Sequence, residues 1–437
     1  MRRFLFALLA AAVVALAPTV RGQDDDEPTL NPDQTGANQA ASTDSPYENM
    51  EVLARAMQLI REDYVNDAKI SYRDLTYSAL RGMLSELDPH SSFMEPRDFK
   101  NMEEDTKSEF GGLGVTVSTK GNMLTILGVA EGTPGFVAGL QPGDQIKKIN
   151  GLSTDKMTMA DAIDMLRGEP GEKVTLTVIR SPGNEIKEFT MTRAVIKVPS
   201  IVDAAVLPTS MTAGRRIGYL RITQFNEPTA AELGEALAKL EKQKIEALVI
   251  DLRFNPGGLL TSAVDVCSLF VQPRTMVVYT QGRTPSHEYY TREMPGGVRK
   301  YPVAILINGS SASGAEIVAG ALKDLHRAIL VGETTFGKGS VQSVVSLPDG
   351  SAMRFTTAHY FTPSRTPIHE HGVAPDIRCA LTFQEEARLY QSHRGRDVPG
   401  AIGQKSGAQD LQLDRAVDAL AGMLLYTERT ASGPNKG

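Results

Sequence analysis

Residues 308–317 read NGSSASGAEI and follow an apolar run of strand length at 303–307. After them, apolar residues recur at helical spacing as far as Leu325. The small residues therefore form a strand-to-helix turn. A second apolar run, at 328–331, leads into the glycine-rich loop TFGKGSVQ at 335–342. We expect two neighbouring strands of one sheet to present these two loops side by side.

A serine and a lysine in these loops suit nucleophilic catalysis. The Ser313 hydroxyl is a poor nucleophile until a base takes its proton, and a lysine is a base only when it is neutral. Burial among apolar groups disfavours the ammonium form, and Phe336 and Val341 are compatible with such a pocket around Lys338. The Gln342 amide, four residues after the lysine, can orient the amine by a hydrogen bond.

A purely structural interpretation of these residues is also open. Residues 313–316 match the Ser-x-x-Glu capping box, in which the serine only satisfies free N–H groups at a helix start. A lone lysine is more often a solvated surface charge. The same helix start, however, favours negative charge that develops at Ser313.

The order and spacing of these motifs resemble those of a known peptidase family. The runs SASGAEI at 311–317 and VGETTFGKGSVQ at 331–342 are similar to the active-site block of the carboxyl-terminal processing proteases, also called tail-specific proteases. This resemblance implies that Ser313 is the nucleophile and that Lys338, 25 positions later, is its general base. The family's glutamine, which follows the lysine, corresponds to Gln342.

The resemblance also implies an oxyanion hole. Residues 251–258 read DLRFNPGG after a buried strand and are similar to the family's Asp-Leu-Arg-x-Asn-x-Gly-Gly motif. In the family, a glycine N–H of this motif pairs with the N–H that follows the nucleophile, here that of Gly314, where alanine is usual. We therefore assign Gly257 and Gly314 as the donors, with Gly258 as the less favoured choice. Asp251 is expected to be structural.

Residues 110–193 predict a small β-rich unit with one helix. The runs GGLGVTV at 111–117 and GLQPGDQI at 139–146 resemble a PDZ domain. In that fold a peptide adds a strand while backbone N–H groups hold its terminal carboxylate. Because no histidine lies at the start of the helix at 159–166, we expect an apolar C-terminal side chain in the ligand. The implied peptide-binding residues are Gly112, Leu113, Gly114, Val115, Met159 and Ile163.

Arg167 lies at the end of that helix. A cation there interacts favourably with the helix dipole, which is the ordinary interpretation. A role in coupling peptide binding to catalysis is the alternative.

The remaining sequence predicts an α/β protease core that resembles the crotonase and Clp-protease type of sheet, because strand and helix patterns alternate after residue 198. Helical spacing before the PDZ unit, with LDPHSSF at 87–93, resembles the family's N-terminal region. The expected organisation is a signal peptide (1–22), a disordered acidic linker (23–45), an N-terminal helical region (46–108), the PDZ domain (109–195), the α/β serine protease core (196–380), and a flexible connection with a C-terminal helix (381–437).

The N-terminus has the anatomy of a signal peptide. Arg2 and Arg3 precede an apolar run of about 14 residues, which is shorter than the roughly 20 that span a bilayer. An uncleaved inner-membrane signal anchor is the alternative. We therefore expect an exported protein of the periplasm or cell envelope.

Composition bounds the remaining function classes. The chain has 437 residues, 41% of them hydrophobic, and a net charge of −6, so no basic surface for nucleic acid is expected. Cys267 and Cys379 are expected to be buried free thiols. His369 and His371 are two residues apart, which is more typical of a loop than of a metal site. No metal or cofactor is predicted.

Together these patterns predict an exported PDZ-containing serine endopeptidase that recognises apolar C-terminal tails of proteins. A catalytically silent PDZ scaffold is the first alternative, and an acyl-CoA enzyme on a related sheet is a second one. Expected partners are protein substrates, an activating adaptor, and a second copy bound through spare apolar surface on the N-terminal helices.

Overall fold

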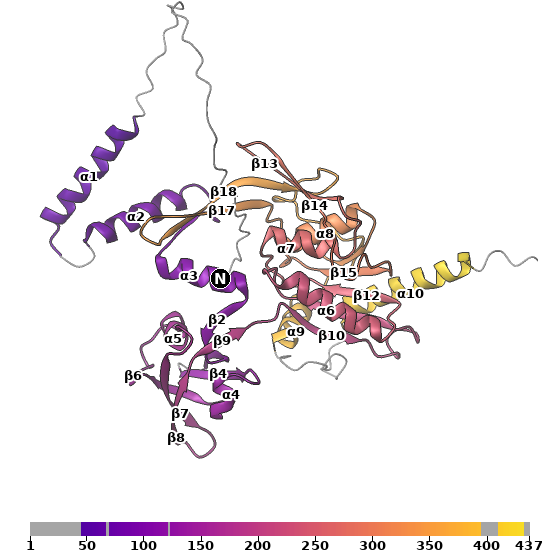
Figure 1. The fold of residues 1–437 in the computed structure, drawn as a ribbon, viewed down its shortest axis with the longest axis horizontal. Helices are drawn as coiled ribbons and strands as arrows, with labels where there is room; N and C mark the ends of the chain where they lie inside the picture. The colour runs from indigo at the N-terminus through magenta and orange to yellow at the C-terminus, as the bar shows by residue number, and fades with distance from the viewer. Residues whose placement is uncertain (1–44, 67–69, 121–122, 395–409, 432–437) are drawn as a thin grey trace, which may run out of the picture. The chain divides into compact units, whose positions relative to one another are not determined.

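The computed structural model describes residues 45–66, 70–120, 123–394 and 410–431. The chain forms two compact units (Figure 1). The smaller takes its described residues from Ala15–Phe99 and Gln342–Thr356, and the larger from Lys100–Val341 and Thr357–Gly437. The predicted signal peptide and nearly all of the predicted acidic linker lie outside the described residues, as does the segment 395–409.

The smaller unit contains the two helices expected from helical spacing, α1 (Pro46–Asp63) and α2 (Tyr72–Ser85). Strand β1 (Ser92–Met94) pairs antiparallel with the start of β18 (Ala352–Phe361). Its core is small: the rings of Tyr77 and Phe93 lie 4.7 Å apart beside Leu84. No residue of α1 is buried, so its apolar side chains are exposed to solvent in a single chain. Helix α3 (Pro96–Lys107) leads into the larger unit.

The PDZ domain enters and leaves through a two-stranded ladder. Strand β2 (Glu109–Gly112) pairs antiparallel with β9 (Ala194–Lys197), with Glu109 opposite Lys197 and Gly112 opposite Ala194. Between them the strands run in the order β3-β4-β5-β7-β8, with β6 beside β5 and two helices, α4 and α5. The bounds are β3 (Val115–Lys120), β4 (Met123–Val129), α4 (Pro134–Ala138), β5 (Gln145–Ile149), β6 (Leu152–Ser153), α5 (Met159–Leu166), β7 (Lys173–Arg180) and β8 (Glu185–Thr192).

The α/β core expected from the sequence is built on a six-stranded sheet in the order β10-β11-β12-β15-β16-β19. All neighbouring pairs are parallel except β10 with β11. The central strands are apolar runs that are fully buried, as expected for parallel strands covered on both faces. The bounds are β10 (Ile201–Val206), β11 (Ile217–Ile222), β12 (Ala247–Asp251), β15 (Val303–Ile307), β16 (Ile329–Gly332) and β19 (Ile377–Arg378).

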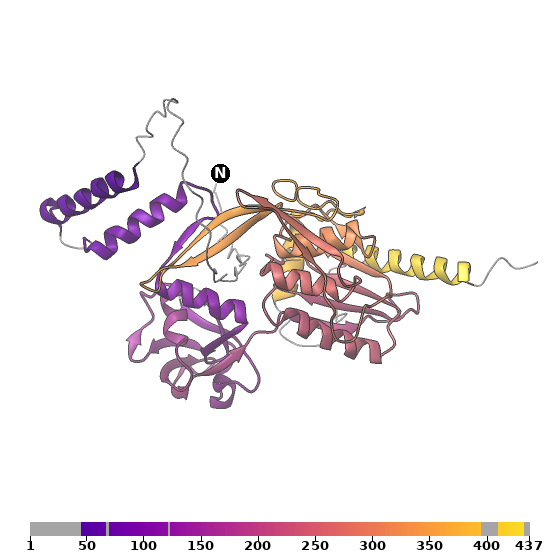
Figure 2. The same cartoon turned by 45° about the horizontal axis from the view of Figure 1, so that its top comes forward.

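Alternate side chains of each strand serve opposite faces of the sheet. Ile250 and Ile305 pack with residues of α6 (Thr229–Lys242), α7 (Leu260–Ser268) and α8 (Gly314–Asp324). The other face is covered by α10 (Leu411–Ala431), through Leu413, Ala416, Val417 and Leu420. The C-terminal end of α10 extends beyond the sheet (Figure 2).

The remaining strands of the larger unit form a hairpin beside this core. Strand β13 (Met276–Gly282) pairs antiparallel with β14 (His287–Tyr290) and with the end of β18. Strand β17 (Ser340–Ser346) pairs with β18.

The carboxyl ends of β12, β15 and β16 lie at one edge of the six-stranded sheet, so the loops that follow these strands lie close together.

One expected segment was wrong. Part of the predicted flexible connection is the helix α9 (Phe383–Arg394). Its sequence is polar, but Thr382 and Glu385 form a reciprocal cap at its start, and Leu389 and His393 are buried. The expected C-terminal helix is present as α10 and continues to Ala431.

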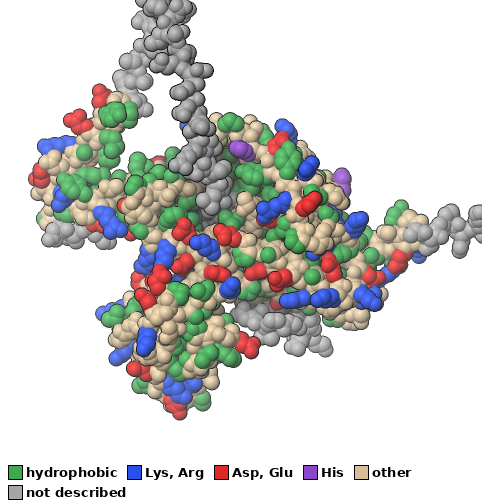
Figure 3. Space-filling model, in the orientation of Figure 1, with side chains coloured by type: hydrophobic (Ala, Val, Ile, Leu, Met, Phe, Trp, Pro, Cys, Tyr) green, Lys and Arg blue, Asp and Glu red, His purple; other side chains and the backbone are tan. Residues whose placement is uncertain are grey.

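Two surface properties bear on function. Lys and Arg side chains are interspersed with Asp and Glu on the face seen in Figure 3, without a continuous basic stripe there. Among the described residues, none of the helices combines the length and apolar character needed to cross a membrane.

Candidate active site

The turn that carries Ser313 joins the end of β15 to α8 and is fixed by hydrogen bonds along its backbone. The Asn308 N–H donates to Ser311 Oγ (3.0 Å). The Ala312 N–H donates to the Asn255 carbonyl (2.9 Å). Ser313 is fully buried and has φ 54° and ψ −114°, a backbone conformation that is costly for a residue with a side chain. Strain of this kind is concentrated at functional sites.

A single carboxylate, that of Glu316, connects the two predicted loops. Its Oε2 accepts the N–H of Ser313 (2.8 Å) and the N–H of Lys338 (2.9 Å). Its Oε1 accepts the Gly337 N–H (2.7 Å) and the Thr335 hydroxyl. Burial raises the pKa of Glu316, although these four hydrogen bonds oppose the rise. The structure therefore brings Ser313 and Lys338 into one hydrogen-bonded cluster.

The Ser313 hydroxyl is not used as a helix cap. The Glu316 N–H donates to the Ser313 carbonyl (2.9 Å), and within the described residues Ser313 Oγ makes no hydrogen bond. Tyr360 is its neighbour: burial raises the pKa of this phenol, and the Ser313 hydroxyl opposes the rise. Ser313 and Glu316 nevertheless occupy the two positions of a capping box, and Glu316 accepts the Ser313 N–H, so the structural interpretation of Ser313 stays open.

Lys338 lies in an interior position. Lys338 is only 6% exposed. The loop that carries it is held by a hydrogen bond from the Phe336 N–H to the Ser311 carbonyl (3.0 Å). The Gly339 carbonyl accepts the Tyr360 N–H (2.6 Å). The Phe336 side chain, expected to wall the lysine pocket, is instead 55% exposed, because the loop turns it outward. Val341 is buried as expected.

Gln342 lies on β17 in the smaller unit, whereas Lys338 belongs to the larger unit. Its side chain is buried, and Nε2 donates to Thr356 Oγ1 (2.7 Å) in the same unit. The structure thus shows where the glutamine is anchored, and its orienting role stays a prediction.

The glycine loop after β12 packs directly on the turn that carries Ser313. A Cβ on Gly257, whose φ is 99°, would lie 2.6 Å from Ser313 Cβ and 2.7 Å from Gly314 N, so no side chain fits at Gly257. A Cβ on Gly314 would lie 3.3 Å from Gly258 N, which is a tight contact. The Gly257 N–H donates to Asn255 Oδ1 (2.8 Å).

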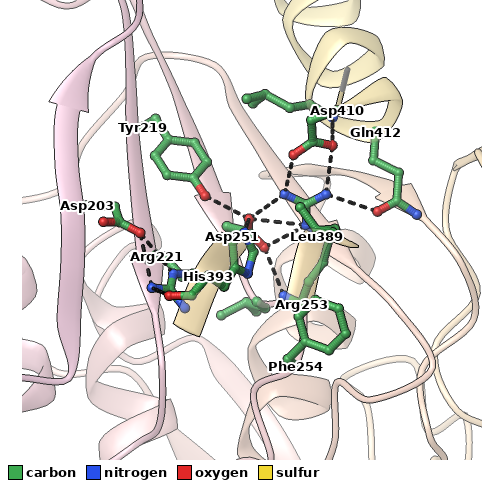
Figure 4. A network of polar contacts seen from close by, with 12 residues as sticks. Asp203, Tyr219, Arg221, Asp251, Arg253, Phe254, Leu389, His393, Asp410 and Gln412 are labelled. Carbon is green, nitrogen blue, oxygen red and sulfur yellow. Dashed lines mark hydrogen bonds and ion pairs between the residues drawn. The ribbon is translucent and has the colours of Figure 1, made fainter. Parts of the chain in front are cut away.

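Behind this loop lies a buried ionic network (Figure 4). The Arg253 guanidinium donates to Asp251 through Nε (3.0 Å) and Nη2 (2.6 Å), and to Asp410 through Nη1 (2.9 Å) and Nη2 (2.8 Å). The Tyr219 hydroxyl donates to Asp251 Oδ2 (2.8 Å). Burial disfavours ionisation of Asp251, but the neighbouring guanidinium outweighs burial and holds the pKa of this carboxyl below its usual range. Asp251 is therefore part of the scaffold behind the glycine loop.

Sequence reasoning missed Asp410 in this network. Its Oδ1 also accepts the Leu413 N–H (3.1 Å), so from the sequence it resembles an ordinary cap at the start of a predicted helix. It also missed Tyr360, which follows from no local motif. Only a fold that places these positions beside Arg253 and Ser313 identifies them.

The PDZ features lie where the sequence suggested. Met159 and Ile163 are half-buried and four residues apart on α5, so they share one face of the helix. Gly114 has φ 73°, and a Cβ there would clash with Thr133. The Arg167 guanidinium lies 4.4 Å from the centre of the Phe110 ring and contacts Asp105 of α3 at 3.3 Å.

Cys267 and Cys379 are free, the first buried and the second half-buried. In the ranges that the structure describes, no three His, Cys, Asp or Glu side chains are grouped so as to hold a metal ion. The rings of His359 and His369 lie 4.5 Å apart.

Comparison with known proteins identifies the same regions. The peptidase family S41 model matches residues 216–379, a PDZ domain model matches 125–180, and the model of the activating protease CtpB N-terminal domain matches 11–97. The solved photosystem II D1 C-terminal processing protease is 29% identical, with a TM-score of 0.44 over 76% of this chain and 92% of that chain.

Two curated relatives match most of the chain. A carboxy-terminal-processing protease of Bartonella bacilliformis is 36% identical over 371 residues, covering 82% of this chain and 81% of the relative. A carboxyl-terminal-processing protease of Synechocystis sp. is 38% identical over 380 residues, covering 86% and 84%. The expected family, the PDZ domain and the α/β peptidase fold are thereby confirmed. The chain belongs to the carboxyl-terminal-processing proteases of peptidase family S41, and it is a serine-type peptidase.

Proposed function

We propose that this chain is an exported endopeptidase that cuts proteins presenting apolar C-terminal tails, with Ser313 as nucleophile and Lys338 as general base. The observation that carries the proposal is the Glu316 carboxylate, which accepts the backbone N–H of both residues. This arrangement fixes the two loops relative to each other, while Ser313 Oγ is not engaged in a cap. Few structural roles require a strained, buried serine beside a buried lysine.

In the proposed reaction, neutral Lys338 takes the proton of Ser313 as Oγ attacks the scissile carbonyl. The bond to the leaving amine breaks after that amine receives the proton, which leaves an ester on Ser313. Lys338 then activates a water molecule that hydrolyses the ester. A buried lysine suits this role because burial disfavours its charged form. The Gln342 amide would orient the amine.

The developing oxyanion would be held by backbone N–H groups from the start of α8 and from the glycine loop after β12. Gly314 supplies one donor, and the N-terminal end of the helix favours negative charge there. Gly257 supplies the other donor only when its bond to Asn255 Oδ1 opens. Gly258 N, which lies beside Gly314, is the alternative donor.

Substrate recognition is assigned to the PDZ domain. A peptide would add a strand beside β3 while the backbone at 112–115 holds its terminal carboxylate. Met159 and Ile163, half-buried on α5, would contact its apolar last side chain. Arg167 joins the end of α5 to α3 through Asp105, so it is the candidate for coupling tail binding to catalysis.

The test is cleavage of an unfolded protein with an apolar tail, by wild type, Ser313→Ala and Lys338→Ala. We expect both variants to lose activity by about 1,000-fold or more, because each removes a member of the nucleophile–base pair. Ser310→Ala, which removes an exposed hydroxyl from the same turn, is the matched control and should retain activity.

Two outcomes contradict the proposal. Activity that survives Ser313→Ala would remove the mechanism. Wild-type protein that binds the tail but never cuts, even with cell-envelope extract as a source of an activating adaptor, would favour the silent PDZ scaffold.

Assembly and location complete the proposal. The apolar residues Met50, Val52, Leu59 and Ile60 of α1 are exposed, and we assign them to contact with a second copy of the chain. Light scattering of a monomer at micromolar concentration would contradict this assignment. Export rests on residues 1–22, and sequencing the N-terminus of the mature protein distinguishes cleavage from anchoring.

A further inference from the structure

We propose that Asp410 and Gln412, at the start of α10, are positioning residues for the glycine loop that faces the nucleophile, and that they act through Arg253. Both lie beyond residue 379, where the S41 match ends. The inference rests on the proposed role of the loop glycines as oxyanion donors.

Arg253 is held from two directions. Asp251, at the end of its own strand, accepts Nε and Nη2. From the other direction, Asp410 accepts Nη1 (2.9 Å) and Nη2 (2.8 Å), and Gln412 Oε1 accepts Nη1 (3.1 Å) (Figure 4). Since the Arg253 side chain is fully buried, water does not replace a lost partner easily. Asp251, Asp410 and Gln412 thus form a clamp around the Arg253 guanidinium. Half of this clamp is supplied from the start of a helix, where Asp410 lies 157 residues away in the sequence.

The clamp itself is anchored independently of the active site. Leu413, Ala416 and Leu420 of α10 are buried against the face of the sheet opposite α8. Gln412 Nε2 donates to the Cys379 carbonyl (2.8 Å) just after β19. The packing of α10 thus sets the position of Asp410. The Arg253 guanidinium lies where it can donate to both Asp251 and Asp410.

From Arg253 the chain leads directly to the nucleophile. The Phe254 N–H donates to Asn308 Oδ1 (3.0 Å). Ser311 Oγ donates to the Leu252 carbonyl (2.8 Å), and the Asn255 carbonyl accepts the Ala312 N–H (2.9 Å). Because the loop packs on Ser313 with no room for one added carbon at Gly257, a displaced Arg253 moves the oxyanion donors relative to Oγ.

The electrostatics also depend on Asp410. Burial disfavours the Arg253 cation, but Asp251 and Asp410 outweigh burial and raise the pKa of this guanidinium. Removal of one carboxylate charge leaves a buried cation with a single counter-ion, and the loop that carries it relaxes toward a new position.

The experiment measures kcat and KM for a tail-bearing peptide with wild type, Asp410→Asn and Glu428→Gln, below the unfolding temperature of each. Glu428 is on the same helix but pairs with Arg215 at the surface, so Glu428→Gln is the matched control. We expect Asp410→Asn to lower kcat by about tenfold to 100-fold, with KM within twofold, because oxyanion donors act mainly in the transition state. Affinity for a peptide aldehyde that mimics the tetrahedral intermediate should fall in parallel.

A merely structural role predicts a lower unfolding temperature with kcat unchanged, and that result would overturn the proposal. A rise in KM alone would also overturn it. If Asp410→Asn does not fold, Gln412→Met tests the same clamp more gently, with an expected loss of about threefold to tenfold in kcat. Ser313→Ala is measured in parallel, since its residual activity tests the nucleophile whatever Asp410 does.

Discussion

Glu316 shows how one side chain controls the distance between two loops. It accepts two bonds from the lysine loop backbone and one from the serine backbone, and the Thr335 hydroxyl adds a fourth. All four of these groups donate hydrogen bonds, so both side-chain oxygens of residue 316 have to act as acceptors. Burial raises the pKa of this carboxyl, and the hydrogen bonds from the four donors oppose the rise.

We expect Glu316→Gln to lower kcat by about 100-fold and the free energy of unfolding by about 2–3 kcal/mol, because the amide nitrogen would face N–H donors. The matched control is Glu333→Gln, because Glu333 directly follows β16 and makes no hydrogen bond within the Glu316 cluster. The measurements are steady-state cleavage and denaturant unfolding. Wild-type kcat in a folded Glu316→Gln protein would show that the carboxylate does not position the dyad.

At this scale, the separation and flanking residues of Ser313 and Lys338 are a specific pattern, so the sequence alone was sufficient to predict that their two loops lie together, and the shared Glu316 carboxylate agrees. It was insufficient where partners are distant in the chain. Asp410 contacts Arg253 only because α10 crosses the back of the sheet, and Phe336 is apolar yet exposed. A local sequence pattern shows that a side chain is apolar. The direction in which that side chain points from a loop, however, depends on tertiary contacts.

The strands of the protease core were the most predictable elements. β15 is fully apolar, and β12 is apolar up to Asp251 at its end; both strands are buried throughout, so composition agrees with the fold. Helix α9 was not predictable in this way, because most of its surface is polar and its few buried residues pack on distant segments. A helix or strand can be predicted from sequence when its own pattern of apolar residues determines which of its side chains are buried.

In the PDZ domain, one turn is fixed by a buried carboxylate. Asp144 accepts Arg180 through both oxygens (2.8 and 2.7 Å) and also the Gln141 N–H (2.9 Å). Burial disfavours ionisation of Asp144, but the hydrogen bonds from Arg180 and Gln141 outweigh it, so the pKa is lowered from 3.8. Ionised Asp144 therefore stabilises the fold.

We expect Asp144→Asn to destabilise the PDZ domain by about 2–3 kcal/mol at pH 7. A lowered folded pKa means that the contribution is complete above pH 3.8 and is lost as the pH falls through the folded value. The difference from wild type in hydrogen exchange of the PDZ peptides should therefore shrink below pH 3.8.

The matched control for this prediction is Asp155→Asn, which breaks a surface pair with Lys147 at 3.7 Å and leaves an amide oxygen that can still accept the Ser153 hydroxyl. This substitution should change stability by less than about 1 kcal/mol. An equal effect of the two substitutions, or a difference that does not depend on pH, would show that Asp144 is not the stabilising group.

At the scale of the whole molecule, the PDZ domain is an insertion between α3 and β10 in the larger unit. The chain is tied to the protease core on the N-terminal side of the insertion, where Asn226 Nδ2 donates to Ser108 Oγ (2.6 Å) and the Glu227 N–H donates to the Thr106 carbonyl (3.1 Å). The two ends of the insertion are paired residues of the β2–β9 ladder. The core can therefore be closed without the domain.

Replacing residues 113–193 by a two-residue type I′ turn should preserve the ladder, because Gly112 and Ala194 are already opposite each other. We expect the shortened enzyme to lose its preference for apolar over charged tails and to cut at an altered rate, since tail binding would no longer shift the site. Competition between two substrates that differ only in the tail measures this. Unchanged selectivity and rate would contradict both the recognition and the coupling roles of the domain.

The same ladder has a consequence for how such enzymes diversify. A segment whose first and last residues are neighbours can be exchanged for another of any length without stretching the flanking chain. Under the proposed role of the PDZ domain in selecting the target, a single recombination event at this junction would give the protease a different set of substrates and leave the residues around Ser313 unchanged.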